Sequence, residues 1–373
     1  MSAVSAERSI EEIIIFLAKA APLLREKRII AGFDGFIDTI VKPVKVYDPE
    51  GNHQFFGTID EFGNFIAAHA HKGASIQYRT MERKPGGNVA NAVKAFDALG
   101  LNVTAIGMFS AGGGAIDPLF SALGKERYSF FPAGLATVME FDDGKIFLSS
   151  AHIAGLDNGQ KVIALIEKAF NGFGQAASGA DITAFLNWSE LPFAHNLWID
   201  IYERYLSEAG TDKTRSAFFD LCDTGAKTHS EIEALVSMIK KTGEKRKTIL
   251  SLNKNEASDI YKKIAGKEDP PEKIAGFLYQ CFALDELVIH QHNRSIAISD
   301  KEGMVIKQCV HNKNPKISTG AGDHFNAAYC CGCLAGLSLA EKLKFANGYS
   351  GAYVAKGHSP LLNETLMAEG KNG

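Results

Sequence analysis

The sequence of 373 residues has little proline, only two tryptophans and no long apolar run. An early apolar stretch at 13–17 follows Glu11 and Glu12 and is far shorter than the roughly 20 residues that a bilayer-spanning helix needs. The chain also lacks the basic start of a signal peptide, and six cysteines at this length are no disulfide framework without one. These absences predict a cytoplasmic protein with no membrane partner.

An excess of charge of one sign is missing too. The 40 lysines and arginines nearly balance the 43 acidic residues, and the basic residues are scattered along the chain. Because a nucleic-acid-binding surface needs clustered positive charge, we expect no nucleic-acid partner. The hydrophobic share of 46% allows a sizeable core, and the length suits one large α/β domain with an accessory piece or two modest domains.

Helical and extended patterns alternate over much of the chain. An amphipathic helix is predicted at 9–21, with Ser9 and Glu12 as a capping box and Pro22 close to its end. Helical periodicity is clearest at 161–170 and 231–240, and strand patterns occur at 28–32, 182–186, 216–221, 248–252, 287–290 and 296–299. This alternation predicts an α/β fold with a mostly parallel sheet covered by helices.

Two hairpin patterns stand apart from this alternation. The first surrounds the Asp-Pro-Glu-Gly-Asn turn at 48–52. The second joins 137–141 to 145–148 through an Asp-Asp-Gly turn. Together they predict a small β-sheet outside the main body.

The most informative motif is Ser-Thr-Gly-Ala-Gly-Asp-His-Phe-Asn at 318–326, before an apolar stretch that can be helical. Small residues at a helix N-terminus let successive N–H groups face one anion, such as a phosphoryl group in transfer. Asp323 would lie in the first helical turn, where a carboxylate can accept the proton of an attacking hydroxyl. The residues alone fit equally a glycine-rich turn with Asp323 as a helix cap.

Two earlier segments could hold an acceptor. Gly86 and Gly87 would let a ligand approach the backbone, and Asn91 offers both a donor and an acceptor to a polyol. Asp34 and Asp38 follow the first strand, where the crevice of an open α/β sheet usually lies. The plainer readings are a capped core helix, a turn at Asp34 and a solvated Asp38.

In this order the motifs resemble those of the ribokinase-like (PfkB) carbohydrate kinase family, over roughly residues 28–360. The resemblance implies an ATP-dependent kinase with a three-layer α/β/α sandwich, a mainly parallel central sheet and a small β lid. It implies acceptor binding, with the choice between the two aspartates open, by Asp34, Asp38, Gly86, Gly87 and Asn91. It implies an anion hole and a catalytic base at Gly320, Ala321, Gly322 and Asp323.

The resemblance extends to the nucleotide. Asn253 and Glu256 match the family's Asn-x-x-Glu signature, which implies that Glu256 organises Mg²⁺ and the phosphates through water. Thr319 and Asn347 are expected beside the nucleotide. Ile317 stands where many members carry an aspartate that helps to bind an activating monovalent cation, which argues against such activation here.

The expected organisation is an N-terminal helical extension at 1–27 and a kinase domain at 28–373, with lid segments at about 41–80 and 126–150. The resemblance also implies that the lid could pair two copies into a homodimer. The expected acceptor is a sugar or sugar-like molecule. A nucleoside kinase of the same fold is an alternative, and a non-catalytic sugar or nucleotide sensor is a weaker one.

Overall fold

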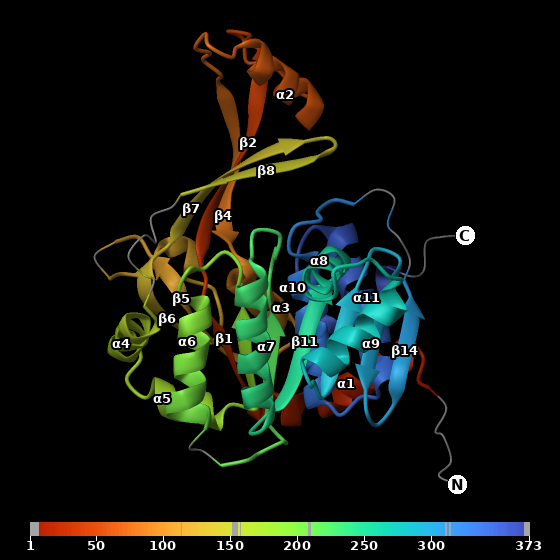
Figure 1. The fold of residues 1–373 in the computed structure, drawn as a ribbon. Coiled ribbons are helices and arrows are strands. Elements are labelled where there is room, and N and C mark those ends of the chain that lie inside the picture. The colour runs from red at the N-terminus through yellow and green to blue at the C-terminus, as the bar shows by residue number, and fades with distance from the viewer. Residues whose placement is uncertain are drawn as a thin grey trace.

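The computed structural model describes residues 7–112, 114–150, 156, 158–207, 210–309, 312 and 315–368. They form a large body of strands and helices from which a narrow lobe rises (Figure 1). None of the helices in these ranges combines the length and the apolar character that crossing a membrane requires.

The body is built on a nine-stranded sheet. In spatial order its strands are β14 (Gly303–Gln308), β13 (Arg294–Ser299), β12 (Glu286–His290), β11 (Lys247–Asn253), β10 (Ser216–Asp220), β9 (Ile182–Leu186), β1 (Arg28–Gly32), β5 (Asn102–Ser110) and β6 (Glu126–Pro132). All strands from β12 to β6 pair in parallel, and β13 and β14 add antiparallel pairs at one edge. The predicted mostly parallel sheet is confirmed.

Helices cover both faces of this sheet (Figure 1). One core contains side chains of α4 (Gly159–Ala169), α5 (Phe173–Gly179), α6 (Ala194–Ile201), α7 (His229–Gly243), α8 (Lys254–Ala265) and α9 (Pro271–Cys281). The other contains side chains of α1 (Ile10–Glu26), α3 (Asn88–Ala98), α10 (Ala321–Leu334) and α11 (Leu339–Lys356). Successive strand residues alternate between the cores, as Ile29 and Ile30 do, so the predicted three-layer sandwich is confirmed.

The N-terminal helix begins as predicted and ends later. Ser9 and Glu12 form the expected capping box, but α1 continues through Pro22 to Glu26. A proline inside a helix removes one hydrogen bond. Leu24, beyond it, is buried in the core with Ile13 and Leu17, and this burial outweighs the loss. The helix therefore packs on the body as part of its second core.

The lobe contains a five-stranded sheet, here called the small sheet. At its centre, β2 (Phe36–Val46) pairs with β3 (Gln54–Phe55), β4 (Tyr78–Gly86) and β7 (Gly134–Phe141), and β7 also pairs with β8 (Gly144–Ser149). The helix α2 (Ile59–Ala68) lies at the tip of the lobe (Figure 1). Both predicted hairpins are present, as the β2–β3 and β7–β8 pairs.

The small sheet differs in extent from the expected lid segments. The small sheet starts at Phe36 and reaches Gly86, beyond the expected 41–80 at both ends. Residues 126–132, expected in the second lid segment, form β6 of the large sheet, because they pair in parallel with β5. The second segment of the small sheet therefore begins at Gly134.

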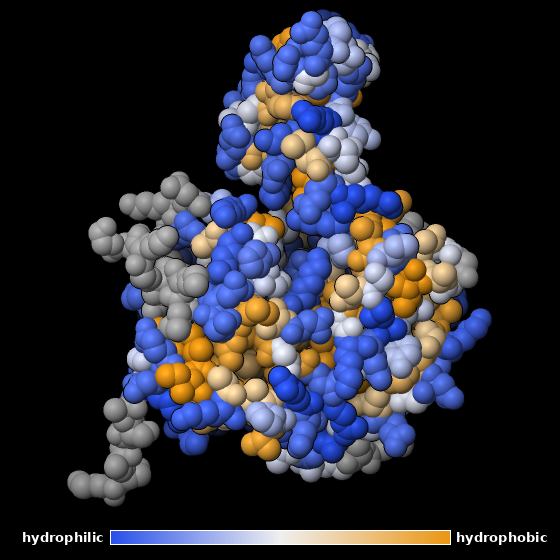
Figure 2. Space-filling model, turned by 180° about the vertical axis from the view of Figure 1, so that it is seen from behind, coloured by the Kyte–Doolittle hydropathy of each residue, from blue (hydrophilic) through white to orange (hydrophobic). Residues whose placement is uncertain are grey.

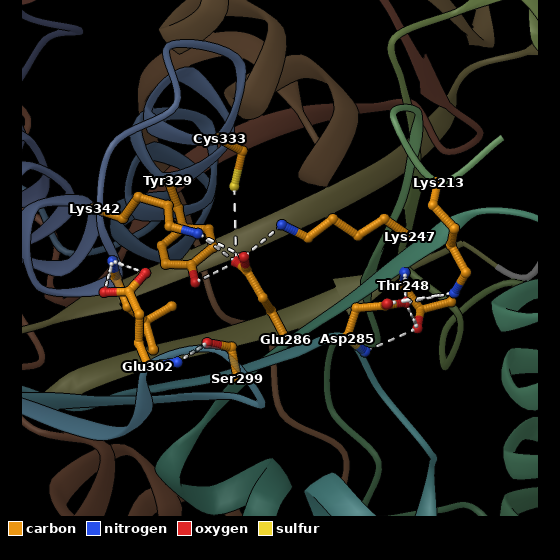
Figure 3. A network of polar contacts seen from close by, with 11 residues as sticks. Lys213, Lys247, Thr248, Asp285, Glu286, Ser299, Glu302, Tyr329, Cys333 and Lys342 are labelled. Atoms are coloured by element: carbon orange, nitrogen blue, oxygen red, sulfur yellow. Dashed lines mark hydrogen bonds and ion pairs between the residues drawn. The ribbon is translucent and has the colours of Figure 1, made fainter. Parts of the chain in front are cut away.

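A buried ionic network joins the layers at the amino end of β12, opposite the strand ends that carry the candidate site (Figure 3). The Glu286 carboxylate accepts from Lys342 Nζ at 2.6 and 2.7 Å, from Lys247 Nζ at 2.5 Å and from the Tyr329 hydroxyl at 2.9 Å. The two lysines hold the pKa of Glu286 below its usual value although burial opposes this. Removing Glu286 would leave the buried Lys342 charge without its carboxylate, so the network should matter for stability.

Candidate active site

Polar side chains gather at the carboxyl ends of the parallel strands, where open α/β sheets have their crevice. Asp34 comes shortly after β1, Asn187 directly after β9, and Asp220 and Asn253 are the last residues of β10 and β11. The N-termini of α3 and α10 meet this edge, since Asp34 contacts the first and Asp220 contacts Asn326 of the second. The site is therefore assembled from segments far apart in the chain.

Asp34 is fully occupied by the protein. Its carboxylate accepts the backbone N–H groups of Asn88 and Val89 at 2.7 and 2.8 Å, and the Asn187 amide at 2.9 Å. Burial raises its pKa to about 6, although these hydrogen bonds oppose the shift. A Cβ on Gly87 would lie 2.8 Å from Asp34 Oδ2, so this glycine allows the contact. Asp34 therefore caps the N-terminus of α3, a role that differs from the turn at Asp34 in the plainer reading.

Asp38 has a different environment. It lies on β2 opposite Lys84 of β4, lines a cleft and is 8% exposed. Burial raises its pKa, while the charges of Lys84 and Lys94 act against the rise. A Cβ on Gly86 would lie 2.3 Å from the Asp38 carboxyl atoms, so only glycine leaves room for this side chain. Of the two aspartates, Asp38 is the one that faces a space for a ligand.

The cleft has a volume of about 850 Å³ and runs between the small sheet and the α10–α11 side of the body. Figure 2 shows the surface hollowed where the lobe joins the body. Its lining residues are Asp38, Ile40, Met81, Glu82, Lys84, Pro85, Asn91, Lys94, Glu140, Lys145, Lys316, Ile317, Thr319, His324, Tyr353, Gly357, His358 and Ser359. Three of the site residues predicted from the sequence therefore line one cleft: Asp38, Asn91 and Thr319.

The glycine-rich segment opens α10 as predicted. Gly320 has φ +88° and precedes the first helical residue, Ala321. The first N–H groups of a helix have no intrahelical acceptor. The Ala321 N–H is satisfied by the Ser318 carbonyl at 3.2 Å, whereas no acceptor within the described ranges receives the N–H of Gly322 or Asp323. These two groups are available to an anion.

Asp323 lies in the first turn of α10 and is 7% exposed. Asn91, which lines the cleft, donates to Asp323 Oδ2 at 3.1 Å. Burial raises the pKa of Asp323 well above its usual value, the negative charge of Asp220 adds to the rise, and the Asn91 hydrogen bond opposes it. A carboxylate with a raised pKa is the stronger base, so this position suits proton removal from a hydroxyl.

A polar network behind Asp323 escaped the sequence prediction. Asp220 accepts from the Asn326 and Asn88 side chains at 2.9 and 3.4 Å, and Ser251 Oγ donates to Asn326 Oδ1 at 2.6 Å. The signal that could have found Asp220 is its place as the one acid at the end of a buried strand, 216–220. Asn187 follows β9 in the same way.

The predicted nucleotide residues take less direct positions. Asn253 and Glu256 form the capping box of α8, with the Asn253 N–H donating to Glu256 Oε2 at 2.8 Å. Burial and the charge of Asp220 raise the pKa of Glu256. Asn347 lies on α11 and donates to Ser295 Oγ on β13 at 2.8 Å, outside the cleft lining. In the structure, Asn253, Glu256 and Asn347 thus each make a hydrogen bond within the protein.

Comparison with known proteins identifies the family to which the sequence is similar. The sequence model of the prokaryotic ketohexokinase family matches residues 17–369. A ketohexokinase of Haloferax volcanii is 21% identical over 351 residues, covering 90% of this chain and 89% of that protein.

Solved structures share the fold. An Arabidopsis thaliana ribokinase, solved with ribose and ATP, superposes with a TM-score of 0.62 at 17% identity, over 92% of this chain and 98% of that chain. A Burkholderia thailandensis nucleoside kinase, solved with inosine, gives 0.60 at 16%, over 92% and 99%. At these identities the structural likeness shows the ribokinase-like fold alone.

Proposed function

Because the chain belongs to the prokaryotic ketohexokinase family, a family of carbohydrate kinases, we propose that it transfers the γ-phosphoryl group of ATP to a hydroxyl of a ketohexose. The observation that carries the proposal is the contact between Asn91, in the cleft, and Asp323, at the N-terminus of α10. This contact brings a side chain that can bind a polyol, a candidate base and two free N–H groups to one place.

In the proposed reaction, Asp38 and Asn91 bind acceptor hydroxyls in the cleft. Asp323 accepts the proton of the attacking hydroxyl, which its raised pKa favours. The N–H groups of Gly322 and Asp323 stabilise the charge on the phosphoryl oxygens. The small sheet covers the acceptor side of the cleft and would exclude water, which limits hydrolysis of ATP. Asp34 supports the site indirectly by fixing the start of α3.

The residues near α10 fit a magnesium ion. Asp220 and Glu256 offer the oxygen ligands that Mg²⁺ prefers, and their pKa values are raised, first of all by burial, which a cation would counteract. Within the described ranges no three His, Cys, Asp or Glu side chains form a metal cage, which suits an ion held mainly by phosphates and water. Glu256 would hold it through water, and the bound ion would neutralise phosphate charge. Ile317 offers no ligand to a monovalent cation, so we propose no such activation.

The cleft lining favours a sugar over a nucleoside. Among the described lining residues, Tyr353 carries the one aromatic carbocycle, and its ring already stacks on His324 at 3.5 Å. The other rings in the described lining are the imidazoles of His324 and His358, so a nucleobase would find no further phenyl, phenol or indole ring to stack on. The nucleoside alternative therefore has less support from the pocket.

The small sheet also supports a homodimer as part of the proposal. Its strands carry six of the 13 exposed large apolar side chains found in the described ranges: Val46, Tyr78, Met81, Leu135, Phe147 and Leu148. Such side chains on a sheet can bury one another when two copies pair. A molar mass of one chain by light scattering at micromolar concentration would contradict this part.

The proposal is tested by measuring ATP consumption with magnesium against ketohexoses, aldohexoses, ribose and nucleosides. We expect turnover on a ketohexose at least tenfold above every other acceptor. A preference for a nucleoside would keep the phosphoryl transfer and replace the acceptor. If ATP is not consumed with any acceptor of the panel, the proposed function is overturned.

A further inference from the structure

His324, the residue after the candidate base, is held by three contacts. Its Nδ1 lies 2.7 Å from the Gly320 carbonyl oxygen, and its Nε2 lies 2.8 Å from Ser359 Oγ. Its ring stacks on Tyr353, with centroids 3.5 Å apart and planes 16° apart. Only 1% of the residue is exposed. The side chain is therefore fixed in position and orientation.

Tyr353 contacts the backbone carbonyl of the residue before Gly320. Its hydroxyl donates to the Thr319 carbonyl at 2.8 Å. Two consecutive carbonyls, those of Thr319 and Gly320, are thus held by neighbouring side chains. Because a peptide group is planar, each contact also fixes the N–H on the other side of its plane, at Gly320 and Ala321, and these two peptide groups directly precede the free N–H groups of Gly322 and Asp323. The Gly320 carbonyl also accepts the backbone N–H of His324 at 3.0 Å, and because glycine at φ +88° can leave this conformation easily, the side-chain contacts add to that bond in holding the turn.

We propose that His324 and Tyr353 are positioning residues for phosphoryl transfer, which hold the Thr319 and Gly320 peptide groups so that the start of α10 is preformed for the anion. This inference rests on the proposed kinase function. Neither side chain needs to touch the substrate for this role. Ser359, through His324, links the segment after α11 to the same loop.

The hydrogen bonds fix the imidazole tautomer. A carbonyl oxygen only accepts, so Nδ1 must carry a proton, and Nε2 of the neutral ring then accepts from the Ser359 hydroxyl. Burial lowers the pKa of His324 to about 4, the nearby Lys94 charge acts in the same direction, and the Gly320 contact opposes them. The ring is therefore neutral at physiological pH, and its contacts should not change between pH 6 and 9.

Replacing the histidine in two ways separates its contacts. In His324→Asn the amide nitrogen can take the place of Nδ1 and keep the bond to Gly320. In His324→Gln the amide reaches the place of Nε2 and keeps only the bond to Ser359. Loss of one positioning contact should lower kcat by roughly 10- to 100-fold, with the acceptor KM within about threefold of wild type. We expect this loss in His324→Gln and in Tyr353→Phe, and recovery to within about fivefold of wild type in His324→Asn.

A matched control is available on α7. His229 Nδ1 also lies 2.7 Å from a backbone carbonyl oxygen, that of Lys263, but His229 is exposed and remote from the cleft lining. His229→Gln should leave kcat and KM unchanged. Equal kcat in His324→Asn and His324→Gln, or a change confined to KM, would overturn the positioning role.

A second readout does not depend on turnover. Labelling threonine with ¹³C at the carbonyl and glycine with ¹⁵N isolates three Thr-Gly peptide groups, at 224–225, 242–243 and 319–320. In Tyr353→Phe the signal of Gly320 should move while the other two stay. An unmoved Gly320 signal in a variant that folds would overturn the inference. A wild type that consumes no ATP with any acceptor would instead overturn the proposed function, so the two failures are distinct.

Discussion

The glycine next to Asp38 offers a sharp test of the acceptor site. A Cβ at Gly86 would lie 2.3 Å from Cγ, Oδ1 and Oδ2 of Asp38, well inside any normal contact, and the φ of Gly86 is not in the left-handed region. Gly86→Ala is therefore free of backbone strain and acts through the carboxyl group, which must move by about 1 Å. A displacement of this size at a binding group costs on the order of 100-fold, or about 2.7 kcal/mol of transition-state stabilisation.

The assay is kcat/KM for the acceptor, with the KM for ATP as an internal reference that should stay constant. Gly63→Ala on α2 is the control, because a Cβ at Gly63 meets nothing within 4 Å. In an Asp38→Ala background the same Gly86→Ala change should cost less than threefold, since the atoms it would strike are gone. A Gly86→Ala enzyme with wild-type kcat/KM, or an equal loss in the Asp38→Ala background, would refute the assignment of Asp38.

Three further predictions concern the base, the ionic network and the half-buried His290. Asp323→Asn should lower kcat by at least about 100-fold with an unchanged circular dichroism spectrum, and near-full activity would contradict its role as base. Lys342→Met should lower the free energy of unfolding in urea by about 1.5–3 kcal/mol, because Glu286 loses its hydrogen bonds to a buried partner while Lys247 remains, and wild-type stability would show that the network matters little. Burial lowers the pKa of His290 to about 4, below its usual value of 6.5, so the unfolded chain binds more protons between these values. Stability should therefore fall as pH decreases through that window, by up to about 1.4 kcal/mol per pH unit for this residue, and His290→Phe should reduce the slope of urea-derived stabilities between pH 6.5 and 4.5. An unchanged slope would contradict the lowered pKa of His290 in the folded protein.

The fold could be predicted largely because its strands and helices have clear periods. Strands such as 182–186 and 248–252 are apolar runs between helical patterns, and the Asp-Gly turn marks the β7–β8 hairpin. What failed depended on tertiary contacts. Pro22 suggested an end to α1, but burial of Leu24 carries the helix on to Glu26. Residues 126–132 have a strand pattern that suits either sheet, and only the pairing with β5 decides.

At the candidate site, too, local patterns could be predicted from the sequence and tertiary contacts could not. Local spacing was enough to predict a helix start at the glycine-rich segment before Asp323 and another after Gly86 and Gly87. It could not separate Asp34 from Asp38, because the difference lies in distant partners: Asn88 and Asn187 satisfy the first, while the second faces the cleft. Asp220 was missed since one acid at a strand end carries little signal until the asparagines of α3 and α10 meet it.

We propose above all that this protein phosphorylates a ketohexose with Asp323 as base. The most direct test follows a mixture of enzyme, Mg-ATP and D-fructose by ³¹P NMR, with the Asp323→Asn variant in parallel. We predict a new phosphomonoester signal that grows in step with ADP for the wild type and at least about 100-fold more slowly for the variant. ADP formation with inorganic phosphate in place of a phosphomonoester, or equal rates for both proteins, would contradict this proposal.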